Sequence, residues 1–347
     1  MRRVLITRLT AMGDVAMTAP IVAAVCKANP DVAFDVLSTP FFRPFFESLP
    51  NLRFIGTDIR KQKNGLRALW ALFRNLKNGT MPDAPLPQGE TYDTVIDLHD
   101  VLRTKVLRTL FRLSGAKVFA IDKGRADKKR LISGARRVQL KPMTERYADV
   151  FRKAGFAVPS EPNFRPKEPI HSILSHQPKG NERWIGVSPF AQHRGKMYPT
   201  DRMAKVLDIL LQQPDVRVFL FGGGDKEKRR ATDLANGRDR CHVMIGVLSL
   251  ADEMSLMSNL DVMLSMDSSA MHVSSLYGVR VVSLWGQTHP YAGFLGYRQS
   301  PDDCVQRADL TCRPCSIFGN KPCRYADFRC FDIAPEVVAS KVLEAHN

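Results

Sequence analysis

Several charged side chains follow short apolar runs, where the strands of a parallel sheet commonly end. Asp14 comes after the run Val4–Arg8 and a turn that contains Gly13. Because glycine lets the backbone approach a ligand closely, the Asp14 carboxylate could act on a bound molecule as a general base. The same position suits a helix N-cap, whose side-chain oxygen accepts from backbone N–H groups. The sequence leaves both roles open for Asp14.

Two later turns carry residue types that could hold a nucleotide. The segment 188–199, SPFAQHRGKMYP, places Lys196 after a predicted strand, where a cation is well placed to hold phosphate. The segment 221–227, FGGGDKE, has three glycines before Glu227, which could accept hydrogen bonds from ribose hydroxyls. Solvated loop charges and a plain tight turn would give the same two patterns.

A further turn, SMDSSAMH, ends a strand at Asp267 and opens a helix. Free N–H groups at a helix start could bind a diphosphate, although Asp267 or Ser268 could equally serve only as a cap. His272 lies inside that helix, a position more typical of a core histidine than of a ligand.

Five of the seven cysteines lie within 304–330. Four thiolates at these spacings could hold a structural zinc, but six residues separate the second pair instead of two. Packing thiols and disulfides are the alternatives. We therefore favour no metal, and the zinc hypothesis concerns Cys312, Cys315, Cys323 and Cys330.

Length and charge narrow the class of protein. A chain of 347 residues is long enough for two domains, and 44% hydrophobic with 25% charged residues excludes wholesale disorder. The net charge is +16, and residues 99–153 alone hold 16 Lys or Arg against five Asp or Glu. Such a stretch attracts phosphates on lipids, glycans or nucleic acids. Few aromatic residues interleave with these charges, so a nucleic-acid-binding protein is only a remote alternative.

Some segments and motifs are absent from the sequence. No run reaches the roughly 18 uncharged apolar residues of a membrane span, and Arg8 and Asp14 interrupt the apolar start, so we expect no signal peptide and a cytoplasmic protein. There is no P-loop, no G-x-G-x-x-G after the first strand and no Asp-x-Asp pair. The last absence favours chemistry without a carboxylate-held metal ion.

Apolar runs alternate with helical segments along the chain, which predicts parallel sheets covered by helices on both faces. Five prolines in 157–183 interrupt this pattern, after which it begins again. We expect an N-terminal Rossmann-like domain over 1–160, a linker over 161–183, and a C-terminal Rossmann-like domain over 184–347. Ligands of such sheets bind at the carboxyl ends of the strands.

The sequence contains four segments that match a known family: RVLITRLTAMGDVAMTAP, TYDTVIDLHDVLRTK, SPFAQHRGKMYP and DVMLSMDSSAMHVSSLYGVRVVSLWG. They resemble glycosyltransferase family 9, the lipopolysaccharide heptosyltransferase group, and the resemblance extends over essentially the whole chain. The resemblance implies the α/β fold called GT-B, in which two Rossmann-like domains face a central cleft. The acceptor is expected on the first domain and the nucleotide-sugar on the second, with the final helix packing back on the N-terminal domain.

The resemblance assigns roles to residues of this sequence. Asp14 falls on the catalytic carboxylate of the family, and Lys196 on a basic residue that neutralises the donor phosphates. Ser269 stands where the family element D-[TS]-G-x-x-H has glycine. Arg103 is the candidate acceptor contact. The expected donor-binding residues are Gly13, Glu227, Leu248, Asp267, Ser268, Ser269 and His272.

The activity implied is inverting, metal-independent transfer of heptose from ADP-heptose to a lipid A-linked inner-core acceptor, with no cofactor. The basic stretch 99–153 would then steer a phosphorylated acceptor at the cytoplasmic face of the inner membrane, through peripheral contact with anionic lipid, and we expect no nucleic acid partner. The alternative within the family is transfer of another nucleotide-linked sugar to a surface glycan.

Overall fold

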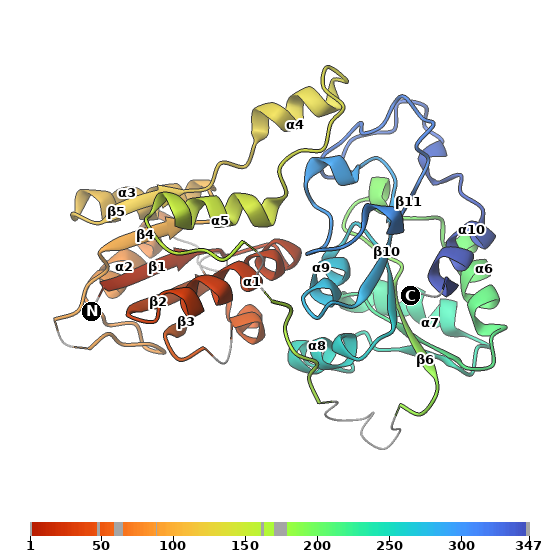
Figure 1. Cartoon of the computed structure of the whole chain (residues 1–347), viewed down its shortest axis with the longest axis horizontal. Helices are drawn as coiled ribbons and strands as arrows, with labels where there is room; N and C mark the ends of the chain where they lie inside the picture. Colours follow the sequence, from red (N-terminus) through yellow and green to blue (C-terminus); the bar gives the residue numbers. More distant parts are fainter. Residues whose placement is uncertain are drawn as a thin grey trace. The chain divides into compact units, whose positions relative to one another are not determined.

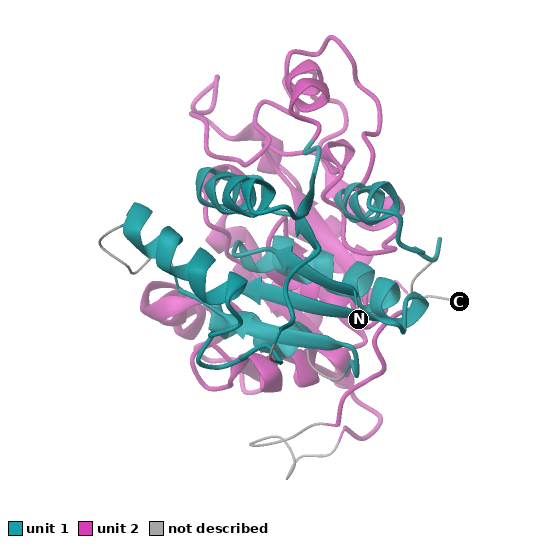
Figure 2. Cartoon of the chain, turned by 90° about the vertical axis from the view of Figure 1, so that its left-hand side faces the viewer, with its two compact units in different colours: residues 1–123, 143–163 teal, residues 124–142, 164–347 magenta. Residues whose placement is uncertain are grey.

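The chain forms two compact units in the computed structural model (Figures 1 and 2). Unit 1 contains residues 1–123 and 143–163, and unit 2 contains residues 124–142 and 164–347. The segment 124–142 therefore belongs to unit 2, although the sequence predicted an N-terminal domain that runs unbroken to residue 160. The structure describes residues 2–46, 49–58, 65–87, 89–160, 163–169 and 179–344, so much of the predicted linker lies outside the described residues.

Unit 1 is built on a parallel sheet of five strands in the order β3-β2-β1-β4-β5. The central strand β1 is buried on both faces, with Val4, Leu5 and Ile6 at most 1% exposed. A strand buried in this way needs a continuous apolar run, which is the signal that the sequence carries. The strands are β1 (Arg2–Thr7), β2 (Val32–Ser38), β3 (Leu52–Gly56), β4 (Thr94–Asp97) and β5 (Lys117–Ala120).

Helices cover both faces of this sheet (Figure 2). The connection from β1 to β2 runs in one direction along the sheet, whereas those from β3 to β4 and from β4 to β5 run in the other. Right-handed crossovers therefore place α1 on one face and α2 and α3 on the other. α5 packs against α1, and α2 packs against α3. The bounds are α1 (Met12–Ala28), α2 (Gly65–Lys77), α3 (Leu102–Leu113) and α5 (Met143–Lys153), with the 3₁₀ helix η1 at Pro40–Phe46.

Unit 2 contains a second parallel sheet, with six strands in the order β11-β10-β9-β6-β7-β8. Two parallel sheets with covering helices confirm the predicted α/β class. The strands are β6 (Arg183–Ser188), β7 (Val216–Leu220), β8 (Cys241–Val243), β9 (Val262–Met266), β10 (Arg280–Trp285) and β11 (Cys304–Gln306). The helices are α4 (Arg125–Ile132), α6 (Thr200–Leu211), α7 (Gly224–Ala235), α8 (Leu250–Ser258), α9 (Ser269–Ser275) and α10 (Pro335–Leu343).

The strand order reverses once in each sheet. The reversal falls between β1 and β4 in unit 1 and between β6 and β9 in unit 2. Connections leave such a pair of strands in opposite directions, so a crevice opens at their carboxyl ends. Ligands bind in this crevice in open α/β sheets. The loops after β1, β4, β6 and β9 are therefore expected to carry the functional residues.

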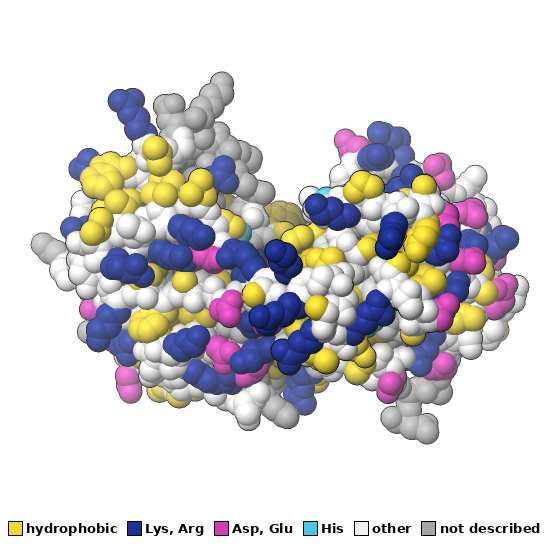
Figure 3. Space-filling view, turned by 90° about the horizontal axis from the view of Figure 1, so that it is seen from above, with side chains coloured by type: hydrophobic (Ala, Val, Ile, Leu, Met, Phe, Trp, Pro, Cys, Tyr) yellow, Lys and Arg dark blue, Asp and Glu magenta, His cyan; other side chains and the backbone are white. Residues whose placement is uncertain are grey.

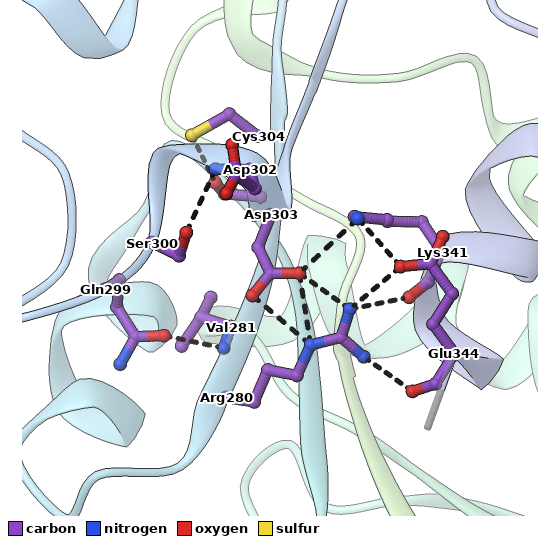
Figure 4. Close-up of polar contacts among 10 residues, drawn as sticks. Arg280, Val281, Gln299, Ser300, Asp302, Asp303, Cys304, Lys341 and Glu344 are labelled. Atoms are coloured by element: carbon purple, nitrogen blue, oxygen red, sulfur yellow. Dashed lines mark hydrogen bonds and ion pairs between the residues drawn. The ribbon is translucent and has the colours of Figure 1, made fainter. Parts of the chain in front are cut away.

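The last helix, α10, packs in unit 2 against α6, and Val338 and Val342 are buried in the core that surrounds β6 and β9. The expectation that this helix packs back on the N-terminal domain is therefore wrong. A buried ion pair supplies the physical reason (Figure 4). Arg280 Nη2 lies 2.6 Å from Asp303 Oδ1 and also donates to the carbonyl of Lys341 at 3.0 Å. One guanidinium thus joins β10, the segment before β11 and the end of α10.

Replacing Asp303 by alanine should destabilise unit 2, because it removes the buried carboxylate from the Arg280 guanidinium and leaves only the half-exposed Glu344 at 3.6 Å. Removing one partner of a buried pair costs about 3–5 kcal/mol, which urea unfolding would measure. The control is Asp309→Ala, whose carboxylate is exposed and pairs with Arg307 at the surface. An equal and small effect of both substitutions would show that the Arg280–Asp303 pair does not hold α10 in place.

Candidate active site

The loops after β6 and β9 meet through an ion pair. Lys196 ends a short 3₁₀ helix, Arg194–Lys196, in the loop after β6, and Asp267 directly follows β9. The Lys196 Nζ lies 2.8 Å from Asp267 Oδ2, and the two side chains are only 17% and 4% exposed. The structure therefore brings together two of the residues predicted to bind the donor. They meet where the strand order of unit 2 reverses.

The loop that carries Lys196 is fixed by close packing around a glycine. The N–H of Gln287 donates to the carbonyl of Gly195 at 2.9 Å. A Cβ at Gly195 would overlap Gln287 Oε1 and would lie 2.6 Å from the carbonyl oxygen of Gly319. Gly319 belongs to the cysteine-rich segment, residues 304–330, and a Cβ there would meet the Lys196 side chain at 2.6 Å. The cysteine-rich segment thus forms one wall of the Lys196 loop.

The residues after Asp267 have structural partners. Ser268 is the N-cap residue of α9, and its hydroxyl lies 3.1 Å from that of Ser265. Ser269 begins α9 with helical backbone, so the glycine expected there is not needed for an unusual conformation. His272 lies in the same helix and is 5% exposed.

Glu227 lies in the first turn of α7, which follows β7, and Leu248 lies in the loop after β8. The Glu227 Oε2 accepts a hydrogen bond from the N–H of Gly223 at 2.8 Å, at the start of α7. Leu248 is half-buried in the turn before α8. A Cβ at Gly222 would meet Glu227 Oε2, Ile245 and Phe190 within 3.4 Å, so the loops after β6, β7 and β8 converge there. Only glycine permits this approach.

In unit 1, Asp14 lies in the first turn of α1 next to Gly13, directly after the loop that follows β1. Its Oδ2 lies 2.5 Å from Nη2 of Arg8, whose side chain is 3% exposed. The other oxygen of Asp14, Oδ1, makes no hydrogen bond or ion pair with a described residue. Asp14 therefore keeps one oxygen for a ligand while Arg8 orients the carboxylate.

Arg8 is held in turn by its surroundings in unit 1. Its Nη1 donates to the carbonyl of Leu98 at 2.7 Å, which ties the end of β1 to the end of β4. Its guanidinium lies 5.8 Å from the ring centroid of Tyr147. Burial raises the pKa of the Tyr147 phenol, and the Arg8 charge opposes that shift only in part. The phenol therefore remains neutral beside Arg8.

The end of β4 carries a second charged network in unit 1. Asp97 is fully buried and accepts from the N–H groups of His99 and Asp100 at 2.9 Å each. Arg108 from α3 pairs with Asp97 at 2.9 Å and with Asp100 at 3.1 Å. Arg103, the predicted acceptor contact, is exposed in the first turn of α3. It makes no ion pair with any residue that the structure describes.

Sequence reasoning missed the structural importance of Arg8, Asp97 and Gln287. Arg8 served there only as a charge that interrupts an apolar run. A charged residue at the end of an apolar run indicates a buried ion pair or hydrogen-bond network, because a buried guanidinium requires partners. Gln287 had no comparable signal, since its contacts with Gly195 depend on the tertiary fold.

The cysteine-rich segment, together with Ile132 and Arg137, lines a cavity of about 270 Å³ in unit 2. Its lining residues include Cys312, Cys315, Cys323 and Cys330. All seven cysteines of the chain are free thiols. Burial raises the pKa of Cys330 to about 11, and burial together with Cys312 raises the pKa of Cys315. Among the described residues, no three His, Cys, Asp or Glu side chains are arranged to hold a metal ion.

A model of glycosyltransferase family 9 (heptosyltransferase) matches residues 88–316. A search of the curated proteins found no match.

Solved structures of heptosyltransferases and of a further family 9 protein share the fold. The two E. coli heptosyltransferases among them have the two-domain GT-B architecture. E. coli heptosyltransferase WaaC with ADP is 21% identical, with a TM-score of 0.63 over 87% of this chain and 94% of that one. E. coli ADP-heptose lps heptosyltransferase II is 17% identical, with a TM-score of 0.68 over 98% and 97%. A family 9 glycosyl transferase from Veillonella parvula DSM 2008 is 19% identical, with a TM-score of 0.75 over 99% and 98%.

Substituting Gly195 by alanine should destabilise unit 2, because the added methyl group overlaps Gln287 and approaches the Gly319 carbonyl. Overpacking of this kind costs typically ~1–3 kcal/mol, which denaturant unfolding would report. Gly223→Ala is the matched control, since nothing lies within 4 Å of a Cβ at that position and its φ of −147° is open to any residue. If both substitutions were equally harmless, the Lys196 loop would not depend on the cysteine-rich segment.

Proposed function

The chain belongs to glycosyltransferase family 9, and from this premise we propose that it transfers heptose from ADP-heptose to a lipid A-linked inner-core acceptor of lipopolysaccharide. The transfer inverts the anomeric centre and needs no metal ion. The family match supports the reaction class. The observation that carries the donor side is the Lys196–Asp267 ion pair at the strand-order reversal of unit 2.

Lys196 is suited to receive the diphosphate of the donor. Its ammonium group is largely buried, so a nearby negative charge interacts with it more strongly than it would in water. In the structure Asp267 supplies that charge. A diphosphate that approaches the carboxyl ends of β6 and β9 adds negative charge beside Asp267 and competes for Lys196. Binding should therefore loosen the ion pair and turn Lys196 toward the phosphate oxygens.

Asp14 is suited to act as the base on the acceptor. As the acceptor hydroxyl attacks the anomeric carbon, Oδ1 of Asp14 takes its proton while Arg8 holds Oδ2. The new glycosidic bond forms on the face opposite the breaking bond to the diphosphate, so the configuration inverts. The transition state resembles an oxocarbenium ion, as in glycoside hydrolysis. ADP leaves with the electron pair of the broken bond.

The leaving diphosphate gains negative charge as the bond breaks. A preorganised cation near that charge lowers the barrier because it does not have to reorient during the reaction. Lys196 fills this role in the proposal, and no Asp-x-Asp pair is required to hold a metal ion. This is the basis for proposing metal-independent transfer.

The remaining donor contacts select the nucleoside and the sugar. Oε1 of Glu227 is available for a ribose hydroxyl while Oε2 stays bound to Gly223, and Leu248 supplies an apolar surface for the adenine ring. Asp267, Ser268, Ser269 and His272 border the sugar and diphosphate in this proposal. Gly13 gives access to the reacting groups beside Asp14. Arg103 is the proposed contact for an acceptor phosphate.

Asp14→Asn should nearly abolish transfer and leave ADP binding unchanged, because the amide cannot accept the proton. General-base catalysis contributes typically ~10²–10⁴-fold, so kcat should fall by about that factor. The rate would be followed as ADP release with EDTA present throughout, and ADP affinity by calorimetry. If the variant kept more than about a tenth of the wild-type kcat, Asp14 would serve only to start the helix.

Lys196→Ala should lower kcat/KM, with an increase of about 2–4 kcal/mol in the activation free energy. This is the usual effect of losing one preorganised electrostatic partner. It should also weaken ADP binding, which calorimetry would measure. Lys205→Ala, an exposed lysine on α6, is the control and should change neither quantity. Unchanged kinetics in the Lys196 variant would move the phosphate site elsewhere.

A further inference from the structure

The outer face of α2 and α3 in unit 1 is unusually apolar for a surface. Leu66 and Trp70 on α2 are 75% and 52% exposed, and Leu102 and Leu113 on α3 are 78% and 80% exposed. Single exposed leucines are common on soluble proteins. Four large apolar side chains on two helices that pack side by side are a different case, and they call for a partner.

Basic residues accompany these apolar side chains, and neither helix contains an acidic residue. Arg108 is not available to a partner, because it pairs with Asp97 and Asp100 beneath the helix. The exposed basic residues of the two helices are Arg67, Arg74, Lys77, Arg103, Lys105 and Arg112. The Nζ of Lys105 also lies 3.8 Å from Asp100, but this side chain is 47% exposed and stays open to solvent. We call these six residues, with the four apolar ones, the α2–α3 surface.

Both helices have an inner face that is buried and an outer face that is exposed. Their inner faces are anchored in the core of unit 1 by residues such as Leu69 and Phe73 on α2 and Leu107 on α3. Their outer faces combine large apolar side chains with Lys and Arg. In Figure 3, hydrophobic side chains gather near the upper left edge of the view with Lys and Arg beside them, and acidic side chains lie farther toward the middle.

We propose that the α2–α3 surface docks the protein on an anionic lipid bilayer. The combination of exposed Trp and Leu with Lys and Arg is that of helices that lie in the membrane interface. The apolar side chains would enter the boundary of the acyl chains, and the basic ones would contact lipid phosphates. No helix in the described parts of the chain is long and apolar enough to cross a membrane. The inference thus concerns contact with the surface of the bilayer.

The location of the α2–α3 surface suits the reaction proposed above. The purpose of the docking rests on that proposed function. α2 and α3 both begin at the carboxyl ends of strands of the unit 1 sheet, the edge at which Asp14 also lies. Leu66 and Leu102 are in the first turns of these helices. A bilayer against the α2–α3 surface would therefore approach the edge of unit 1 that is proposed to receive a lipid-linked acceptor.

The basic segment at Lys128–Arg130, part of the stretch 99–153 that the sequence predicted to contact anionic lipid, is less suited to this role. Lys128 is only 8% exposed, and its Nζ lies 4.2 Å from the ring centroid of Phe294. Arg130 pairs with Asp127 on its own helix. Both residues belong to unit 2, whereas the α2–α3 surface belongs to unit 1.

Trp70 provides a direct probe of the proposal. The other two tryptophans, Trp184 and Trp285, are fully buried in unit 2. A change in tryptophan emission on adding vesicles therefore reports on Trp70. With vesicles of phosphatidylglycerol and phosphatidylcholine in equal parts, the emission should shift to the blue and be quenched by brominated lipid. Phosphatidylcholine alone should give little change, and added salt should weaken the binding, because salt screens exposed charges.

Charge reversal separates this surface from the overall charge of the protein. Arg67→Glu with Arg74→Glu should weaken vesicle binding by more than roughly tenfold, since each basic residue near an anionic surface contributes about 1 kcal/mol. Lys205→Glu with Arg229→Glu, at exposed positions of unit 2, makes the same change in net charge and should have little effect. Circular dichroism would establish that both variants fold.

Three results would overturn the proposal. Equal losses in the two double variants would mean that vesicles respond only to net charge. Vesicle binding with unchanged Trp70 emission would place the contact on another surface. A blue shift without vesicles, together with a dimer in size-exclusion chromatography, would show that the α2–α3 surface pairs two copies of the chain. ADP affinity measured in the same samples is independent of docking, so a failure here is distinct from a failure of the proposed transfer.

Discussion

The reversal of strand order in each sheet is the constraint on which the candidate active site depends. At that point neighbouring parallel strands send their connections in opposite directions, and their carboxyl ends remain open to a ligand. In unit 2 the opening is bridged by the Lys196–Asp267 ion pair, with a largely buried ammonium group. In unit 1 the equivalent position holds the Arg8–Asp14 pair, and Arg8 also binds the end of β4. Each unit thus presents one charged pair at its reversal, one suited to phosphate and one to proton transfer.

The support around these pairs comes from segments that are distant in sequence. Gly195 and Gly319 bring the cysteine-rich segment against the Lys196 loop, and Arg313 in that segment donates to the carbonyls of Trp285 and Thr288 near the end of β10. The Arg280–Asp303 pair then secures the segment before β11 and the last helix. The cysteine-rich segment therefore has a structural role, because it packs against the Lys196 loop.

Much of the fold could be predicted because buried parallel strands need continuous apolar runs. The strands that begin at Val4 and Trp184, and the turns after them, were recognisable for this reason. α4 was not, because only Lys128 and Leu131 of that basic helix are buried and its contacts are tertiary. The final helix was misplaced because a resemblance carries no information about the Arg280–Asp303 pair. For the site, residue types at strand ends predicted Lys196 and Asp267, whereas their direct pairing and the burial of Arg8 depend on the fold.

The most direct test of the proposed function is the acceptor-dependent release of ADP from ADP-heptose. The protein would be incubated with ADP-heptose and with lipopolysaccharide that lacks heptose, and the product would be examined by nuclear magnetic resonance. The account predicts that ADP appears only when the acceptor is present, and that the new glycosidic bond has the opposite anomeric configuration to the donor. Transfer from a different nucleotide-sugar alone, or retention of the anomeric configuration, would contradict it.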